Sequence, residues 1–100
     1  MFAVIFEDNL AADPHIRASL MPEHLAFLEA HADQVRAAGP LAENAGGPYG
    51  GLWLVQSDSE QDVERLIKKD PFWATDLRKS YRIFVWNQVF ANGKHQAPPA

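Results

Sequence analysis

Apolar residues in this chain gather into short runs, and the spacing inside each run predicts one element. Residues 2–6 form a β-branched and aromatic run that is typical of a buried strand. From residue 22 onward, apolar residues recur every three or four positions, which predicts a helix over residues 22–38. Gly39-Pro40 would end that helix, because glycine suits the left-handed cap and proline cannot continue a helix. A weak strand signal at 41–45 and a clear one at 52–56 then predict a hairpin.

The second half of the chain continues this alternation of helix and strand. Ser57-Asp58-Ser59 offers N-caps at capping-box spacing, and Asp70-Pro71 ends the apolar stripe that follows. Residues 81–90 have the pattern of a last strand, and residues 91–100 that of a loose tail. We therefore expect a single domain over residues 1–90 and a C-terminal tail over 91–100.

The predicted order is strand, helix, strand, strand, helix, strand. With short connections and right-handed crossovers, this order gives an α+β, ferredoxin-like βαββαβ sandwich with both helices on one face of the sheet. The other face also needs cover, because Trp53, Phe84 and Trp86 cannot all lie under two helices. A second copy of the chain is the simplest source of that cover, so the sequence predicts a homodimer.

Composition narrows the class of protein. A length of 100 residues, with 47% hydrophobic and 22% charged residues, fits one globular domain. The net charge of −4 and the lack of a basic run argue against nucleic acid as a partner. The chain has no cysteine, which excludes disulfides, thiolate chemistry and cysteine-ligated metals. The longest apolar run, residues 2–6, is too short to span a membrane, so we expect a cytoplasmic protein.

Two chemically useful side chains are expected to meet at one end of this fold. Antiparallel helices would place His24, in the first turn of the first helix, beside Asp70, just past the end of the second. A carboxylate beside a histidine fixes one tautomer and favours the imidazolium, and the other ring nitrogen can then move a proton near neutral pH. A plainer interpretation stays open, in which His24 is an ordinary helix residue and Asp70 only a helix stop.

The sequence offers little for a metal or a cofactor. His24 and His31 are seven residues apart on the predicted helix, about 10 Å along its axis, which is too far to share a metal. His15 and His95 lie in irregular regions. The Gly46–Gly51 connection lacks the lysine and the following helix of a phosphate-binding loop, so it is interpreted as a flexible hairpin. We expect neither a metal nor an organic cofactor.

Four segments carry a resemblance to a known family: Pro22-Glu-His-Leu25, Ala38-Gly-Pro40, Asp70-Pro-Phe72 and Trp86-Asn-Gln-Val-Phe90. Their order and spacing resemble those of the YciI-like (YCII-related) proteins over residues 1–90. The resemblance implies a dimeric α+β barrel and a His–Asp dyad, which maps here onto His24 and Asp70. The activity linked to the family is a lyase-type dehydrochlorination of a chlorinated aromatic diol, and most members have no assigned reaction.

The resemblance also bears on the pocket. Arg17 matches a position where family members often carry arginine. Met21 stands where a basic residue is frequent, and residues 73–76 replace a small, glycine-containing segment. Both departures border the predicted pocket, so the family's substrate is not carried over to this chain.

Taken together, the sequence favours a small enzyme that works without a cofactor. His24 would act as general base or acid and Asp70 would orient it, in a proton transfer with elimination or isomerisation on a small molecule, aromatic ones included. Arg17, with Arg78 as the second choice, would hold an anionic or phenolic oxygen, and Tyr49 would reach the ligand from its loop. The alternative is a module of the same fold that binds a small molecule or forms dimers without turnover, and such a module has no need of a His–Asp pair.

Overall fold

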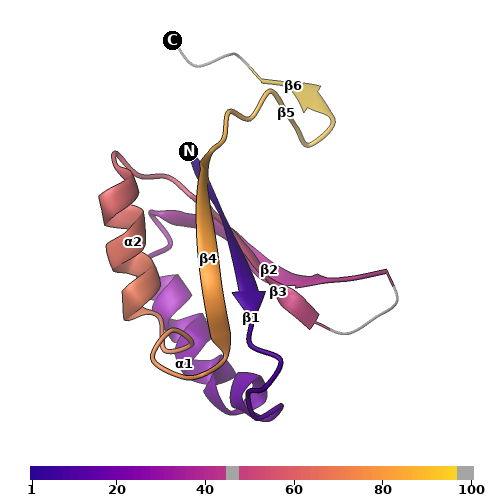
Figure 1. Cartoon of the computed structure of the whole chain (residues 1–100). Helices are drawn as coiled ribbons and strands as arrows, with labels where there is room; N and C mark the ends of the chain where they lie inside the picture. Colours follow the sequence, from indigo (N-terminus) through magenta and orange to yellow (C-terminus); the bar gives the residue numbers. More distant parts are fainter. Residues whose placement is uncertain (45–47, 97–100) are drawn as a thin grey trace.

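The computed structural model describes residues 1–44 and 48–96, and Figure 1 shows how its elements are arranged. The predicted order of strand, helix, strand, strand, helix, strand is confirmed, and two short strands follow it. The elements are β1 (Phe2–Asp8), α1 (Ile16–Ala30), β2 (Val35–Ala42), β3 (Pro48–Val55), α2 (Glu60–Lys69), β4 (Arg78–Val85), β5 (Phe90–Ala91) and β6 (Lys94–His95).

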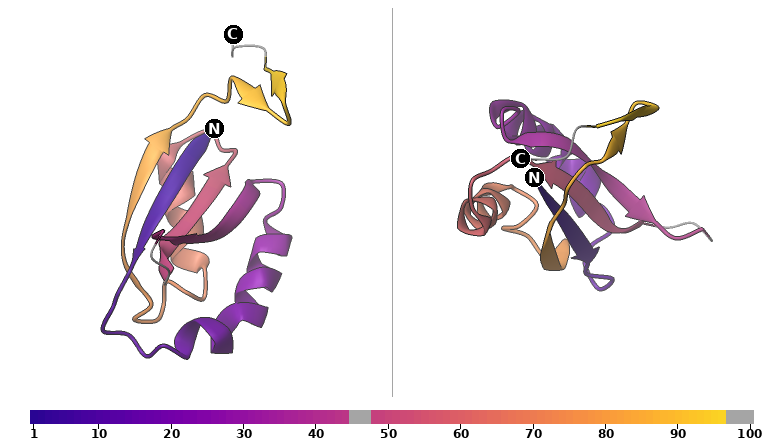
Figure 2. Two further views of the ribbon diagram at one scale, coloured as in Figure 1. Left: turned by 90° about the vertical axis from the view of Figure 1, so that its right-hand side faces the viewer. Right: turned by 90° about the horizontal axis from the view of Figure 1, so that it is seen from above.

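The first four strands form one antiparallel sheet in the order β2-β3-β1-β4. Both helices cover the same face of this sheet, and the other face is open (Figures 1 and 2). This strand order and the two helices on one side make an α+β fold with ferredoxin-like topology, as the sequence predicts.

The hydrophobic core lies between the sheet and the helices. It is built from alternate residues of the two central strands and from one face of α2: Val4, Phe6, Trp53, Val55, Val63, Leu66 and Ile67. The Trp53 ring meets Phe6 edge-on at 5.1 Å between centroids and lies 6.1 Å from Phe27 of α1. Trp53 is therefore a core residue under the helices, not a contact on the open face.

The residues that predict the start and the end of α2 in the sequence have these roles in the structure. The Ser59 hydroxyl accepts the backbone N–H of Asp62 at 3.2 Å, which caps the first turn. Acidic residues in the first turn and Lys68 and Lys69 in the last complement the helix dipole. The helix ends at Lys69 with Asp70 as its C-cap, so Asp70 is held at a defined point where the chain turns.

The predicted helix over residues 22–38 is wrong at both ends. The Asp13 side chain accepts the N–H of His15 at 2.9 Å, and α1 begins directly after this turn, six residues before Pro22. Pro22 lies inside the helix on an exposed position, where its missing N–H leaves one turn without a hydrogen bond. The spacing of apolar residues gave a wrong end of the helix because it counted Val35 with the residues of α1. Val35 is the first residue of β2.

Gly39-Pro40 does not end a helix; it lies within β2. This strand is at the edge of the sheet, where a proline without an N–H costs no ladder hydrogen bond if it faces outward. Of the strand predicted at 41–45, residues 41 and 42 are the end of the longer strand Val35–Ala42, residues 43 and 44 are outside it, and residue 45 lies outside the described residues.

The last strand also differs from the prediction. β4 covers Arg78–Val85 instead of residues 81–90, and β5 and β6 form a small hairpin beyond it. Asn92 and Gly93 make its two-residue turn with φ of 54° and 74°, which is the pairing that a type I′ turn requires. Gly46, Gly47 and the last four residues of the predicted tail lie outside the described residues.

Candidate active site

The buried side of α1 places a histidine against the sheet. Leu20, His24, Phe27, Leu28 and His31 recur every three or four residues and are all at least partly buried. His24 is the most buried of them, and it lies in the middle of α1 rather than in its first turn. The sequence prediction that His24 lies in the first turn of the helix is therefore wrong.

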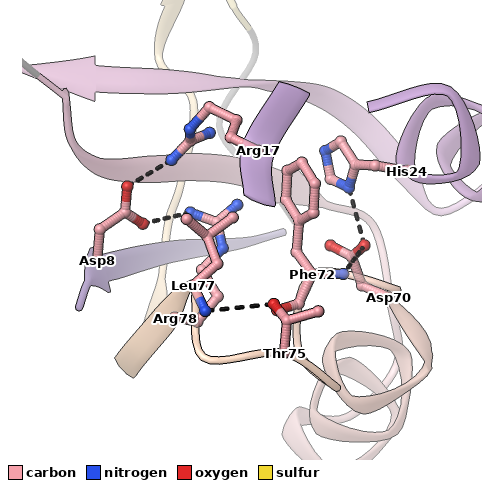
Figure 3. Close-up of polar contacts among 8 residues, drawn as sticks. All are labelled: Asp8, Arg17, His24, Asp70, Phe72, Thr75, Leu77 and Arg78. Atoms are coloured by element: carbon pink, nitrogen blue, oxygen red, sulfur yellow. Dashed lines mark hydrogen bonds and ion pairs between the residues drawn. The ribbon is translucent and has the colours of Figure 1, made fainter. Parts of the chain in front are cut away.

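His24 and Asp70 are in hydrogen-bond contact across 46 residues of sequence. Nδ1 of His24 lies 2.8 Å from Oδ1 of Asp70, whose side chain is 3% exposed. The same oxygen accepts the backbone N–H of Phe72 at 3.1 Å (Figure 3). An ionised carboxylate only accepts hydrogen bonds, so Nδ1 carries the proton and Nε2 is left as the base of the neutral imidazole.

The Phe72 ring stacks on the imidazole. Their centroids are 4.0 Å apart and the two planes differ by 9°. The segment after Asp70 is held in turns by Thr75, whose hydroxyl donates to the Phe72 carbonyl at 2.9 Å and accepts the Leu77 N–H at 3.2 Å. The imidazole of His24 is thus fixed by a hydrogen bond at its edge and by an aromatic ring on its face.

A second polar cluster lies on the other side of Phe72. Asp8, at the end of β1, accepts from Arg17 of α1 through Oδ2 and from Arg78 of β4 through Oδ1, the latter at 3.1 Å (Figure 3). Sequence reasoning singled out both arginines but missed Asp8. The strand pattern could have identified Asp8. It follows Val4 and Phe6 at every second position of β1, so its side chain faces the same, helix-covered side of the sheet.

Arg78 is deeply enclosed for a charged residue. Its side chain is 3% exposed, and its guanidinium carbon lies 4.4 Å from the centre of the Phe6 ring and 5.3 Å from that of Phe72. Desolvation by burial lowers the pKa of Arg78 from its usual value, and the attraction of Asp8 opposes that effect. Gly51 leaves room for the guanidinium, because a Cβ there would lie 3.0 Å from Nη1.

A cavity of about 160 Å³ joins the two clusters. Its polar lining consists of Arg17, His24 and Arg78. The remaining lining residues are apolar or glycine: Met21, Leu25, Leu28, Ala38, Gly39, Pro40, Trp53 and Phe72. An apolar pocket with a few convergent polar groups is the usual make-up of a small-molecule site.

Residues 1–87 match the family model of the YCII-related domain. The chain belongs to this family. The match covers β1 to β4 and both helices, so the predicted family is confirmed over residues 1–87, which end within the last of the four sequence segments.

Among solved structures, this YCII-related domain is similar to the 5-chloro-2-hydroxyhydroquinone dehydrochlorinase of Burkholderia phenoliruptrix AC1100, in complex with 2,5-dihydroxybenzoquinone, with a TM-score of 0.74. The two chains are 21% identical, and the similarity covers 85% of this chain and 91% of the dehydrochlorinase. At this identity the likeness shows a shared fold. No curated protein matches the sequence at a significant level.

Three further residues were predicted for the site of this YCII-related domain: Arg17, Arg78 and Tyr49. Arg17 and Arg78 both line the cavity, so the structure brings together four of the five residues predicted for the site. Tyr49 lies on β3 with 43% of its surface exposed, and it is not among the lining residues.

Within residues 1–44 and 48–96, no three His, Asp or Glu side chains are grouped to hold a metal. No helix in the same part of the chain is long and apolar enough to cross a membrane.

Proposed function

We propose that this YCII-related domain is an enzyme that moves a proton on a small molecule, with His24 as general base or acid. The observation that carries the proposal is the pairing of His24 with Asp70 at the wall of a cavity. Asp70 holds the proton on Nδ1, and Nε2 is then the nitrogen available for exchange with a bound molecule. Asp70 and Phe72 are positioning residues, since both act through the imidazole.

The proposed reaction class is elimination or isomerisation. His24 takes a proton from the substrate. In an elimination the electron pair left behind forms a double bond and expels the leaving group as an anion; in an isomerisation it moves a double bond, and His24 returns the proton to another atom of the substrate. The similar fold of a dehydrochlorinase supports the elimination branch. A positioned base of this kind contributes about 10²–10⁴-fold to the rate. In this proposal Arg17 and Arg78 hold an anionic or phenolic oxygen, and neither a metal nor an organic cofactor takes part.

The direct test replaces His24 of α1 and His31, the C-cap of α1, one at a time. We expect His24→Gln to lower turnover about 10²–10⁴-fold. His31→Gln is the matched control, because His31 is the C-cap of the same helix, and its Nδ1 lies 2.9 Å from the Phe27 carbonyl oxygen, away from Asp70. Chlorinated hydroquinones and small cyclic carbon acids in D₂O are suitable first substrates, with chloride release and hydrogen–deuterium exchange as the readouts.

The alternative is a module that binds small molecules without turnover. It is favoured if no substrate of the panel reacts above the rate of His24→Gln, while the wild-type protein still binds members of the panel. Equal loss of turnover in His24→Gln and His31→Gln would also contradict the proposal, because it would show a general effect on the helix.

A homodimer is the second part of the proposal. Strand residues alternate between the two faces of a sheet, so Ile5, Leu52, Leu54 and Phe84 point away from the helices. These apolar side chains lie on the open face together with Arg82, which pairs with Ile5, and Phe84 is 41% exposed. A patch of this kind on a single copy marks an interaction site. The second copy's open face would cover it and complete an α+β barrel.

We expect wild-type protein to sediment near twice 11.2 kDa and Leu54→Glu near 11.2 kDa. A carboxylate in the middle of the covered face would weaken the dimer by roughly 100-fold or more, because it would be buried without a partner. Gln56→Glu is the control, since it adds the same charge at an exposed position just after β3. A wild-type protein that stays monomeric at micromolar concentration would rule out the barrel.

A further inference from the structure

The chain ends in an arm that leaves the domain. Beyond β4, residues 86–96 run past the end of the sheet and form the β5–β6 hairpin, which stands clear of both helices (Figures 1 and 2). The Trp86 N–H donates to the Met1 carbonyl at 2.9 Å, which is the only hydrogen bond between this arm and the rest of the described chain. The other hydrogen bonds of the arm, such as that from the Gln96 N–H to the Val89 carbonyl at 2.8 Å, stay within it.

The hairpin lacks the support that its size requires. Its turn at Asn92-Gly93 is well formed, but each of its strands has only two residues. An isolated two-stranded hairpin is at best marginally stable in water. Two apolar side chains of the arm lie in solvent, since Val89 is 62% and Phe90 57% exposed. A surface that covers them would remove apolar area from water and hold the hairpin in place.

The open face of the sheet contains a hollow, the β2 groove, that has room for one of these side chains. It measures about 150 Å³ and lies over β2 and β3. Its lining is apolar or glycine throughout and consists of residues 37–41, Leu52 and Leu54. Gly39 pairs with Leu52 in the ladder, and a Cβ at Gly39 would meet nothing within 4 Å, so the missing side chain leaves space there. An apolar cavity of about 150 Å³ holds one benzene ring, which is the size of a phenylalanine side chain.

The arm and the β2 groove of one copy lie at opposite edges of the sheet. β4, which carries the arm, and β2 are the outer strands, with β1 and β3 between them. Neighbouring strands are about 4.8 Å apart, so the outer strands are separated by roughly 14 Å. The arm cannot fill the groove of its own copy without folding back across the open face. When two such sheets close into a barrel, their outer strands meet, and β4 of one copy beside β2 of the other brings the arm to the groove.

The charges of the chain also favour a second copy as the partner. All thirteen acidic residues lie within residues 1–76, so the arm has none. Its Lys94 carries a positive charge on an exposed position of β6, beside His95. The arm is therefore a basic segment on a chain of net charge −4, and unlike charges attract it toward another copy of the same chain.

We propose that the arm of each copy docks on β2 of a second copy, with the Phe90 ring in the β2 groove. The proposal rests on the dimer of the proposed function and names a contact that holds the dimer together. The β2 groove lies back to back with the cavity of the candidate active site, because Ala38, Gly39 and Pro40 line both. The arm of one copy thus supports a wall of the active site of the other.

Photocrosslinking of the full-length chain tests this contact. Phe90→p-benzoylphenylalanine keeps an aromatic side chain and, on irradiation, forms a bond to a neighbouring C–H group. Unlabelled and ¹⁵N-labelled chains are mixed, left to exchange subunits and irradiated, and mass spectrometry identifies the joined peptides. We expect products of mixed isotope content that join residue 90 of one chain to β2 or β3 of the other. Crosslinks within one chain, crosslinks to another region, or no crosslink would overturn the proposal. Gln61→p-benzoylphenylalanine, at an exposed position of α2, is the control and should give no crosslink between copies.

Two variants change the contact from its two sides. Phe90→Ser removes the ring, and Gly39→Val fills the groove without meeting any atom within 4 Å at its Cβ. We expect each to weaken the dimer about 10- to 100-fold, because a buried aromatic anchor contributes much of the affinity of an interface. Asn87→Ser, at an exposed position of the same arm, should dimerise as the wild type does. Unchanged dimer affinity in both Phe90→Ser and Gly39→Val would contradict the contact.

The failure of this inference and of the proposed dimer can be told apart. A wild-type protein that sediments near twice 11.2 kDa, with no crosslink from residue 90 to the second copy, would overturn the arm contact and leave the dimer standing. A wild-type protein that stays monomeric would overturn both. Neither result bears on the role of His24, because Phe90 is not among the residues that line the cavity of its own chain.

Discussion

Gly50→Ala is expected to abolish cooperative folding. A Cβ at position 50 would lie 1.7 Å from the carbonyl oxygen of Phe6 and 2.7 Å from its carbon. Both are backbone atoms, so no side chain can move aside, and the two central strands β1 and β3 would have to separate. We expect a loss of more than about 4 kcal/mol, which is a large share of the roughly 5–15 kcal/mol by which an ordinary domain is stable. Urea denaturation followed by circular dichroism measures it.

Gly39→Ala is the matched control for this effect. Gly39 lies on the edge strand β2, and a Cβ there would meet nothing within 4 Å. Its backbone is not in the left-handed region that Gly93 occupies, so alanine fits without strain. We expect no loss, or a gain of about 0.4–1 kcal/mol from reduced freedom of the unfolded chain. Equal unfolding midpoints for the two variants would show that β1 and β3 are not packed this closely.

Asp8→Asn is expected to have the second largest effect on stability. The change removes the only negative charge bonded to Arg17 and Arg78 within the described residues, and it leaves a buried guanidinium without a counter-ion. Breaking a buried pair from one side costs about 3–5 kcal/mol. A thermal melt followed by circular dichroism measures this loss.

Glu7→Gln separates this effect from a general loss of negative charge. Glu7 is the neighbouring residue, 42% exposed, and its oxygen lies 3.5 Å from Nζ of Lys79, which is 64% exposed. An exposed pair of this kind contributes about 0–1 kcal/mol. If Asp8→Asn costs no more than Glu7→Gln, Asp8 does not hold the two arginines in place.

The order of elements could be predicted because it depends on local patterns that the fold preserves. The apolar runs at β1 and β3 and the caps of α2 are where the sequence places them. The helix over residues 22–38 could not be predicted in this way, because the choice between helix and strand at 35–38 depends on pairing with β3. Gly39-Pro40 stops a helix in most contexts, and only the edge position of β2 makes it compatible with a strand.

The site could be predicted in part for a similar reason. His24 and Asp70 are chemically distinctive, and the predicted topology places them near the ends of neighbouring elements. Their contact could therefore be predicted from the sequence. The role of Asp8 depends on two arginines that reach it from α1 and β4, and no spacing in the sequence shows that convergence. Phe72 was part of a recognised segment, yet its stacking on the imidazole depends on the turn held by Thr75.

The contact between Asp8 and Arg78 spans 70 residues, and that between His24 and Asp70 spans 46. Contacts of such separation form late, because closing a long loop costs entropy before the contact stabilises anything. On the ribosome, where the N-terminal part of a chain emerges first, neither cluster exists until α2 and then β4 have been released. A nascent chain that ends before β4 would carry His24, Asp70 and the pair of Asp8 with Arg17, but it would lack Arg78, which lines the cavity. The completion of β4 is therefore the step that adds Arg78 to the cavity and to the cluster around Asp8.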